Sequence, residues 1–182
     1  MKKSVALAIL AAAMATPAFA ADNGLYIGAN LGNAAISGAN FGGLTKTSDT
    51  SMSFLGGYQV NKNLAVEVQY IDFGKIYAQA SHPITTTGTS LSVIGILPVG
   101  ESFAVLGKFG MASTKLKVSC DTCTPPNYRS TRSAAVFGLG GQYNLNQSIG
   151  IRVGYEAYAV GNVSDQTDGN YRVVSAGVVY KF

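Results

Sequence analysis

The sequence predicts an all-β fold: an eight-stranded antiparallel up-and-down transmembrane β-barrel, preceded by a cleaved signal peptide. Three observations support this prediction. Charged residues make up 12% of the chain, against about 25% in typical globular domains. The chain contains no apolar run near the roughly 18 residues that a membrane-spanning helix needs. Its apolar residues instead alternate with small or polar residues, at the period of two that is typical of β-strands.

The N-terminal residues have the features of an export signal. A positive start is followed by an apolar stretch of about eleven residues, which is too short for a membrane-spanning helix. A small-x-small pattern then predicts cleavage between Ala20 and Ala21. We therefore expect two parts, a signal peptide over residues 1–20 and a transmembrane β-barrel domain over residues 21–182.

Eight segments of the mature chain carry the strand alternation. It is clearest in four segments, residues 64–70, 103–111, 149–155 and 174–182. Four further segments alternate with more Gly, Ser and Ala, and these are residues 25–32, 50–60, 87–97 and 134–145. Their lengths are close to the roughly 9 to 11 residues of a transmembrane β-strand.

The two phases of the clear strands differ in chemistry. Glu67, Lys108 and Arg152 share a phase whose other members are mostly small, whereas the opposite phase is apolar, aromatic or Gly. We expect the bulky phase to face lipid and the small phase to face a narrow interior. A soluble β-sandwich would also alternate, but it would place more charges on its outer face.

The connections between these segments are alternately short and long. The short ones are residues 61–63, 99–102 and 146–147. The long ones are residues 33–49, 74–86, 114–133 and 159–170. Short periplasmic turns and long external loops are typical of membrane barrels, so we expect periplasmic termini and four extracellular loops. Aromatic residues near the short turns predict an interfacial girdle of Tyr58, Phe103, Tyr143, Tyr180 and Phe182.

Several stretches resemble the OmpA-like family of small eight-stranded outer-membrane barrels. They are residues 63–74, 109–112, 142–145, 151–156 and 177–182. The resemblance implies an integral protein of the bacterial outer membrane, and it extends over the whole mature chain. Because the sequence shows no catalytic motif, we predict that the protein is not an enzyme.

The C-terminal tail is the most specific part of this resemblance. Gly177, Tyr180 and Phe182 match the Gly-x-x-aromatic-x-Phe assembly signal of the family, whereas Ala176 stands where a polar residue is usual. The resemblance implies that the barrel-assembly machinery and periplasmic chaperones are partners of this chain.

Four charged residues are candidates for a cluster in the barrel lumen. Glu67, Lys108, Arg152 and Glu156 all point inward by phase, and the first three lie three to five residues from the short-turn ends. Buried charges must pair. The cluster could gate a narrow pore, as is proposed for OmpA-like barrels, or form part of a packed core. We favour the packed core, because eight strands leave little space inside.

Cys120 and Cys123 lie in the third long connection. Export through an oxidising periplasm favours a loop disulfide between them. A zinc site would need two further ligands and His82 is the only histidine, so we expect no metal and no cofactor. His82 is expected in a loop, where no triad partners support the alternative of a lipid A-modifying enzyme.

The remaining expectations concern partners. The formal charge of +4 falls to about +2 without Lys2 and Lys3, which is too small to indicate nucleic acid. Outer-membrane lipid and lipopolysaccharide are expected around the barrel. Four cations flank the third long connection, where they could contact lipopolysaccharide phosphates or equally form a solvated basic loop base: Lys115, Lys117, Arg129 and Arg132. We predict a structural or surface-interaction role, with the external loops binding any ligand or host surface.

Overall fold

The computed structural model describes residues 23–37, 44–46, 48–78, 82–118, 129–160 and 170–182. Every regular element in these ranges is a β-strand: β1 (Gly24–Ser37), β2 (Leu44–Lys46), β3 (Ser48–Asn61), β4 (Leu64–Ala78), β5 (His82–Val99), β6 (Phe103–Val118), β7 (Arg129–Asn144), β8 (Ile149–Val160) and β9 (Asn170–Lys181). Across the same ranges, no helix is long and apolar enough to cross a membrane.

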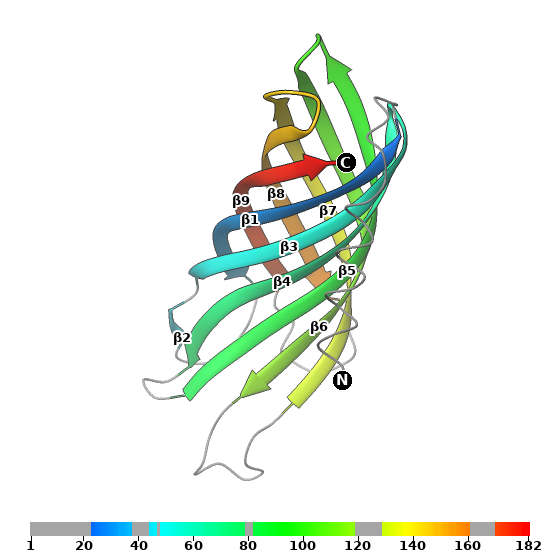
Figure 1. Cartoon of the computed structure of the whole chain (residues 1–182). Helices are drawn as coiled ribbons and strands as arrows, with labels where there is room; N and C mark the ends of the chain where they lie inside the picture. The colour runs from blue at the N-terminus through cyan, green and yellow to red at the C-terminus, as the bar shows by residue number, and fades with distance from the viewer. Residues whose placement is uncertain (1–22, 38–43, 47, 79–81, 119–128, 161–169) are drawn as a thin grey trace, which may run out of the picture.

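The strands form one closed antiparallel barrel (Figure 1). Each long strand pairs with its neighbours in the chain, and β1 closes the sheet by pairing with both β3 and β9. β2 has three residues and pairs only with the far end of β4. The eight long strands confirm the predicted fold class, and β2 is a short addition to it.

Three tight turns join the strands at one end of the barrel, which we call the turn end. Asn61 Oδ1 accepts a hydrogen bond from the Asn63 amide at 2.8 Å, and Asn146 Oδ1 accepts one from the Ile149 amide at 2.7 Å. Gly100 has a φ of +76°, which glycine adopts without strain. Tyr26 pairs with Lys181, so the first and last strands also meet here. We call the opposite end the loop end.

The strands are longer at the loop end than the sequence predicts. β5 has 18 residues, and β6 and β7 have 16 each. Much of the expected long connections, including parts of 74–86 and 114–133, is therefore strand. The prediction was wrong there because the outward residues become polar, which hides the alternation while the hydrogen-bonded ladder continues. His82, which was expected in a loop, begins β5 opposite Ala78.

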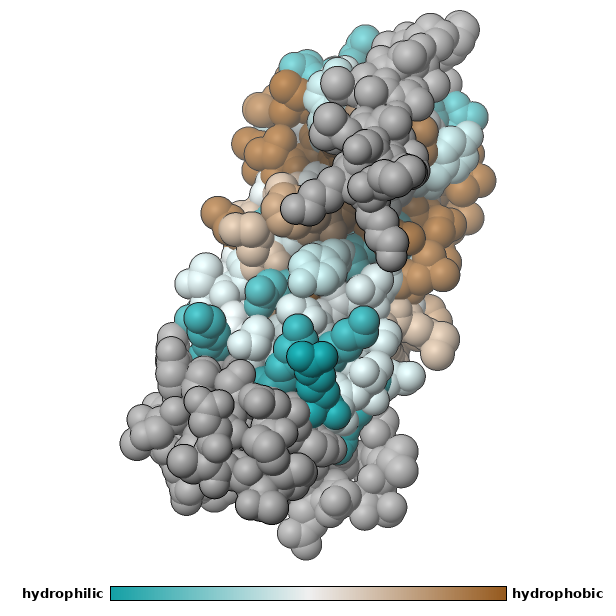
Figure 2. Space-filling view, turned by 60° about the horizontal axis from the view of Figure 1, so that its bottom comes forward, coloured by the Kyte–Doolittle hydropathy of each residue, from teal (hydrophilic) through white to brown (hydrophobic). Residues whose placement is uncertain are grey.

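The outer wall has an apolar band next to the turn end. Met111 and Leu139 are each 71% exposed on this band. On β6 the band extends from Phe103 to Met111, roughly 25 to 30 Å along the strand. Figure 2 shows this brown region giving way to white and teal residues toward the loop end. A single apolar band on the outer wall is what a barrel surrounded by lipid requires.

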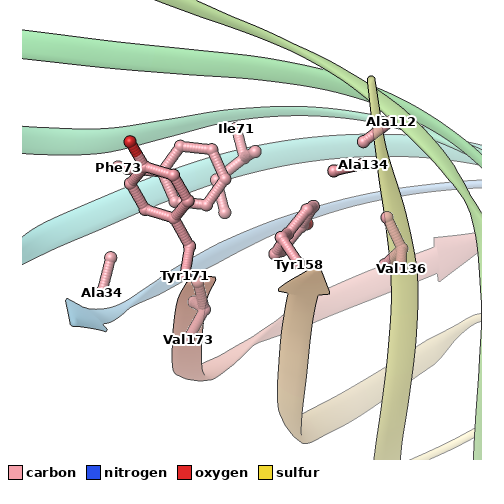
Figure 3. Packing of buried hydrophobic residues seen from close by; sticks show 9 residues of the cluster. All are labelled: Ala34, Ile71, Phe73, Ala112, Ala134, Val136, Tyr158, Tyr171 and Val173. Carbon is pink, nitrogen blue, oxygen red and sulfur yellow. The ribbon is translucent and has the colours of Figure 1, made fainter. Parts of the chain in front are cut away.

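The interior contains bulky side chains, which corrects the expectation of a small-residue lining. Near the turn end lies a cluster of Tyr26, Leu55, Ala65, Ile94, Ala104, Leu106 and Val179. Near the loop end lies a second cluster of Ala34, Ile71, Phe73, Ala112, Ala134, Val136, Tyr158, Tyr171 and Val173 (Figure 3). We call the second one the aromatic plug.

Three rings form the centre of the aromatic plug. The Phe73 ring lies edge-on to Tyr158, with centroids 5.0 Å apart, and its centroid is 4.7 Å from that of Tyr171. Thr86 Oγ1 lies 3.2 Å from the Tyr171 hydroxyl, which joins β5 to β9 across the lumen. The plug was missed from the sequence because its aromatic residues lie beyond the segments of clear alternation.

Candidate functional site: the ionic cluster of the lumen

An ionic cluster lies inside the barrel between the two apolar clusters. It contains Glu67 of β4, Lys108 of β6, and Arg152 and Glu156 of β8. Antiparallel pairing places these inward positions from three strands close to one height, because each lies a few residues from the turn end. The structure therefore brings together all four charged residues that the sequence analysis assigned to the lumen.

Glu67 is the centre of the ionic cluster. Its side chain is 1% exposed, and each carboxylate oxygen meets one cation. Arg152 Nη1 donates to Oε2 at 2.7 Å, and Lys108 Nζ donates to Oε1 at 3.1 Å. Lys108 Nζ also donates to Glu156 Oε1 at 2.8 Å. Two carboxylates and two cations thus balance in charge, as buried ionic groups require.

Four uncharged residues complete this network. The Tyr26 hydroxyl donates to Glu67 Oε2 at 3.1 Å, and the Tyr158 hydroxyl donates to Glu156 Oε2 at 2.6 Å. Gln69 Oε1 accepts from Lys108 Nζ. Gln142 Oε1 accepts from Arg152 Nε at 3.2 Å and from Arg152 Nη2 at 3.0 Å. The sequence analysis missed these residues, although all four share the inward phase, and that phase was the signal that could have found them.

The space around the ionic cluster is small. The cavity that Glu67, Lys108 and Arg152 line has a volume of about 40 Å³. On the turn-end side a wider opening of about 550 Å³ extends down to Arg152. Toward the loop end, Tyr158 connects the ionic cluster to the aromatic plug. The lumen is therefore crossed by two successive filled layers, the ionic cluster and the aromatic plug, while apolar residues near the turn end line the opening below them.

The charged groups of the ionic cluster pair with one another and with tyrosine hydroxyls. Each carboxylate of the ionic cluster accepts hydrogen bonds from a cation and from a tyrosine. Arg152 also lies over the Tyr26 ring, 5.5 Å from its centroid, which adds a cation–π contact. No set of three or more side chains suited to binding a metal ion occurs within the described ranges.

The C-terminal residues lie at the turn end of β9. The Phe182 amide donates to the Leu25 carbonyl at 3.0 Å, and its ring meets the Tyr180 ring edge-on at 5.1 Å. Gly177 lies opposite Asn30 on β1. A Cβ on Gly177 would overlap the Ala29 carbonyl oxygen and the Asn30 side chain. Packing against β1 therefore requires glycine here, independently of any assembly signal.

We expect Gly177→Ala to lower the free energy of unfolding by about 1–3 kcal/mol, because the added methyl group overpacks the wall between β9 and β1. Urea unfolding in detergent micelles or lipid vesicles measures the change. Gly107→Ala is the matched control, since a Cβ there meets nothing within 4 Å. Equal stability of the two variants would contradict the close approach of β1 to Gly177.

Some of the other candidate residues lie outside the described part of the chain, and the rest differ in which face of the barrel wall they occupy. The expected cleavage site at Ala20 and Ala21 and the expected disulfide of Cys120 and Cys123 lie outside the described residues. Of the four cations assigned to lipopolysaccharide, three point outward from β6 and β7, and these are Lys115, Lys117 and Arg129. Arg132 instead lies in the inward phase opposite Thr114, so the structure does not group it with the other three.

Solved structures resemble this barrel closely in fold. Neisserial surface protein A has a TM-score of 0.72 and 19% identity, and the match covers 87% of this chain and 97% of that chain. Ail, the attachment invasion locus protein of Yersinia pestis, has a TM-score of 0.58 and 15% identity, over 87% of this chain and 99% of that one. OprG of Pseudomonas aeruginosa has a TM-score of 0.60 and 14% identity, over 89% and 96%.

Sequence comparison gives the family. No curated protein matches the chain. The profile described as "Outer membrane protein beta-barrel domain" matches residues 4–182, which is nearly the whole chain. Together with the closed eight-stranded barrel, this confirms the resemblance inferred from the sequence and places the protein in the bacterial outer membrane. The chain belongs to the outer membrane protein beta-barrel domain family.

Proposed function

We propose that this protein is a sealed, non-enzymatic barrel with a structural or surface-interaction role, in which the loop end carries any binding. The observation that supports this most is the filled lumen. The ionic cluster leaves a cavity of only about 40 Å³, and the aromatic plug lies beyond it. Transport through the centre would require several buried residues to move together, whereas binding at the loop end requires no change in the barrel.

We further propose that the loop end faces the cell exterior and the turn end faces the periplasm. The short turns, the start of β1 and the end of β9 all lie at the turn end, as in outer-membrane barrels generally. The wall extends beyond the apolar band only toward the loop end. In this orientation Gly177, Tyr180 and Phe182 are available to the barrel-assembly machinery from the periplasm. Ail, which is named an attachment invasion locus protein, supports a surface-interaction role by its similar fold.

We expect the folded wild-type protein to show no discrete conductance steps in planar bilayers. The reason is that the ionic cluster and the aromatic plug leave no continuous aqueous path through the lumen. Unboiled samples that migrate as folded barrel on gels provide the control that the protein in the bilayer is native. Reproducible single-channel steps from such a preparation would contradict the sealed barrel and support the alternative of a narrow pore.

That alternative has one observation in its favour. The opening of about 550 Å³ at the turn end leads directly to Arg152, so only the ionic cluster and the aromatic plug separate it from the loop end. The same bilayer recordings decide between the two functions. The enzymatic alternative predicts a changed lipid A mass profile on overexpression, whereas the proposed role predicts an unchanged profile.

Cysteine labelling on intact cells tests the orientation. In a Cys120→Ser/Cys123→Ser background, a cysteine replacing the exposed Asn170 at the loop end should react with a membrane-impermeant maleimide. A cysteine replacing the exposed Gln147 at the turn end should react only after cell breakage. The reverse pattern would overturn the proposed orientation.

A further inference from the structure

Three cations lie in one row across the outer wall near the loop end. Lys75 of β4 pairs with Thr85 of β5, and Thr85 pairs with Lys117 of β6. Lys117 in turn pairs with Arg129 of β7. Lys75, Lys117 and Arg129 therefore occupy three of the four positions of one cross-strand row, and all three are exposed. Their sequence numbers differ by up to 54, so only the closed sheet brings them together.

A fourth cation lies one row nearer the apolar band. Lys115 is exposed on the same face, opposite Thr87 and Thr131. We call Lys75, Lys115, Lys117 and Arg129 the basic wall patch. Neighbouring strands are about 4.8 Å apart, so Lys75 and Lys117 are roughly 10 Å apart at the backbone. Long, flexible side chains at this spacing can converge on one anionic group.

The basic wall patch keeps a net positive charge within the described ranges, since one carboxylate, that of Asp72, shares its rows with four cations. None of its four side chains forms an ion pair with another described residue. Asp72 lies two strands from Lys115 in the same row, and its carboxylate accepts a hydrogen bond from the Gly74 amide at 2.9 Å. Lys117 and Arg129 lie directly opposite each other, a pairing of like charges that costs stability unless an anion lies between them.

The position of the patch indicates the anion. On β6 the last outward apolar residue is Met111, and Ser113, Lys115 and Lys117 follow on the same face. At about 3.3 Å per residue and a tilt near 45°, the two lysines lie roughly 10 to 15 Å above the apolar band. This is the layer of phosphorylated headgroups, and it borders the wall rather than the barrel mouth. A ligand there is anchored in the membrane beside the protein.

We propose that the basic wall patch binds the phosphate groups of lipopolysaccharide in the outer leaflet. The inference rests on the proposed orientation, in which the loop end faces outward. Each lysine or arginine near an anionic lipid surface contributes modestly, so several must act together. Four cations on three neighbouring strands, with threonine hydroxyls between them, can donate to one phosphorylated headgroup from several directions.

Native mass spectrometry of the folded protein in micelles tests this proposal with rough lipopolysaccharide as the probe. We expect Lys117→Gln/Arg129→Gln to weaken binding about tenfold relative to wild type. The matched control is Lys62→Gln/Arg172→Gln, which removes the same charge at exposed positions outside the patch. Arg172 is a suitable control because its wall neighbours are Ala35 and Ala157. The control should change binding less than threefold.

Two further measurements identify the ligand group. Dephosphorylated lipopolysaccharide should bind wild type and Lys117→Gln/Arg129→Gln equally weakly, and raised salt should release the phosphorylated form. Equal binding of both forms to wild type, or equal loss in the control variant, would overturn the proposal. Binding of soluble sucrose octasulfate by the wild-type protein without binding of lipopolysaccharide would also overturn the proposal. Loss of binding leaves the cysteine labelling result unchanged, so the proposed orientation is tested separately.

Discussion

Glu67→Gln should lower the free energy of unfolding by about 3–5 kcal/mol, because it removes one partner of a buried ion pair. Glu67 is the only carboxylate within the described ranges that pairs with Arg152, and it also pairs with Lys108. Without it, Arg152 keeps its charge in the lumen and loses its anion. Urea unfolding followed by circular dichroism is suitable, since the chain has no tryptophan for fluorescence.

Two further variants isolate the buried pair. Glu101→Gln removes an exposed carboxylate at the turn end and should change stability by less than about 0.5 kcal/mol. Glu67→Gln/Arg152→Gln removes both charges and leaves Lys108 paired with Glu156. This double variant should recover part of the loss, with a coupling of about 0.5–3 kcal/mol. Additive losses would mean that Glu67 and Arg152 do not interact in the folded barrel.

Val153→Arg should destabilise the barrel by about 2–4 kcal/mol, the cost of a cation on the lipid face near the bilayer midplane. Val153 is 53% exposed and lies midway along the apolar part of β8, between Ile149 and Tyr155. The same urea titration in lipid vesicles measures the change, and the amount of folded protein in outer-membrane fractions should fall with it.

Asn33→Arg is the matched control for this substitution. Asn33 also points outward on β1, and it is the next outward residue after the apolar Leu31 toward the loop end. A cation near the membrane interface costs only about 0–1 kcal/mol. Equal effects of the two arginines would contradict the position of the apolar band, and normal folding of Val153→Arg would contradict its contact with lipid.

The sequence was sufficient to predict the barrel, because alternation, few charges and short turns are all local signals. The charges of the ionic cluster also follow from phase, since Glu67, Lys108 and Arg152 lie in clear strands at similar distances from the turns. These positions constrain each other only through closure of the sheet. Strand phase identifies such inward positions even when the contacts between the strands are unknown.

The aromatic plug and the upper wall could not be predicted in the same way. Phe73 and Tyr158 have the inward phase of Glu67 and Glu156. They lie beyond the apolar band, however, where the outward residues are polar and alternation no longer distinguishes the two faces of the strand. Lys75 joins the row of Lys117 and Arg129 only through a register shift between Asp72 and Lys75, next to Gly74 with a φ of +81°. No sequence period reports such a shift.

The stacking of two unlike layers, ionic and aromatic, makes the proposed closure of the lumen redundant. Truncating Phe73 leaves Lys108, Glu67 and Arg152 across the path, while neutralising those charges leaves the rings. In the sealed barrel that we propose, a single substitution therefore leaves one of the two layers in place. A mutant that admits solutes would have to change side chains of opposite chemistry at two depths at once.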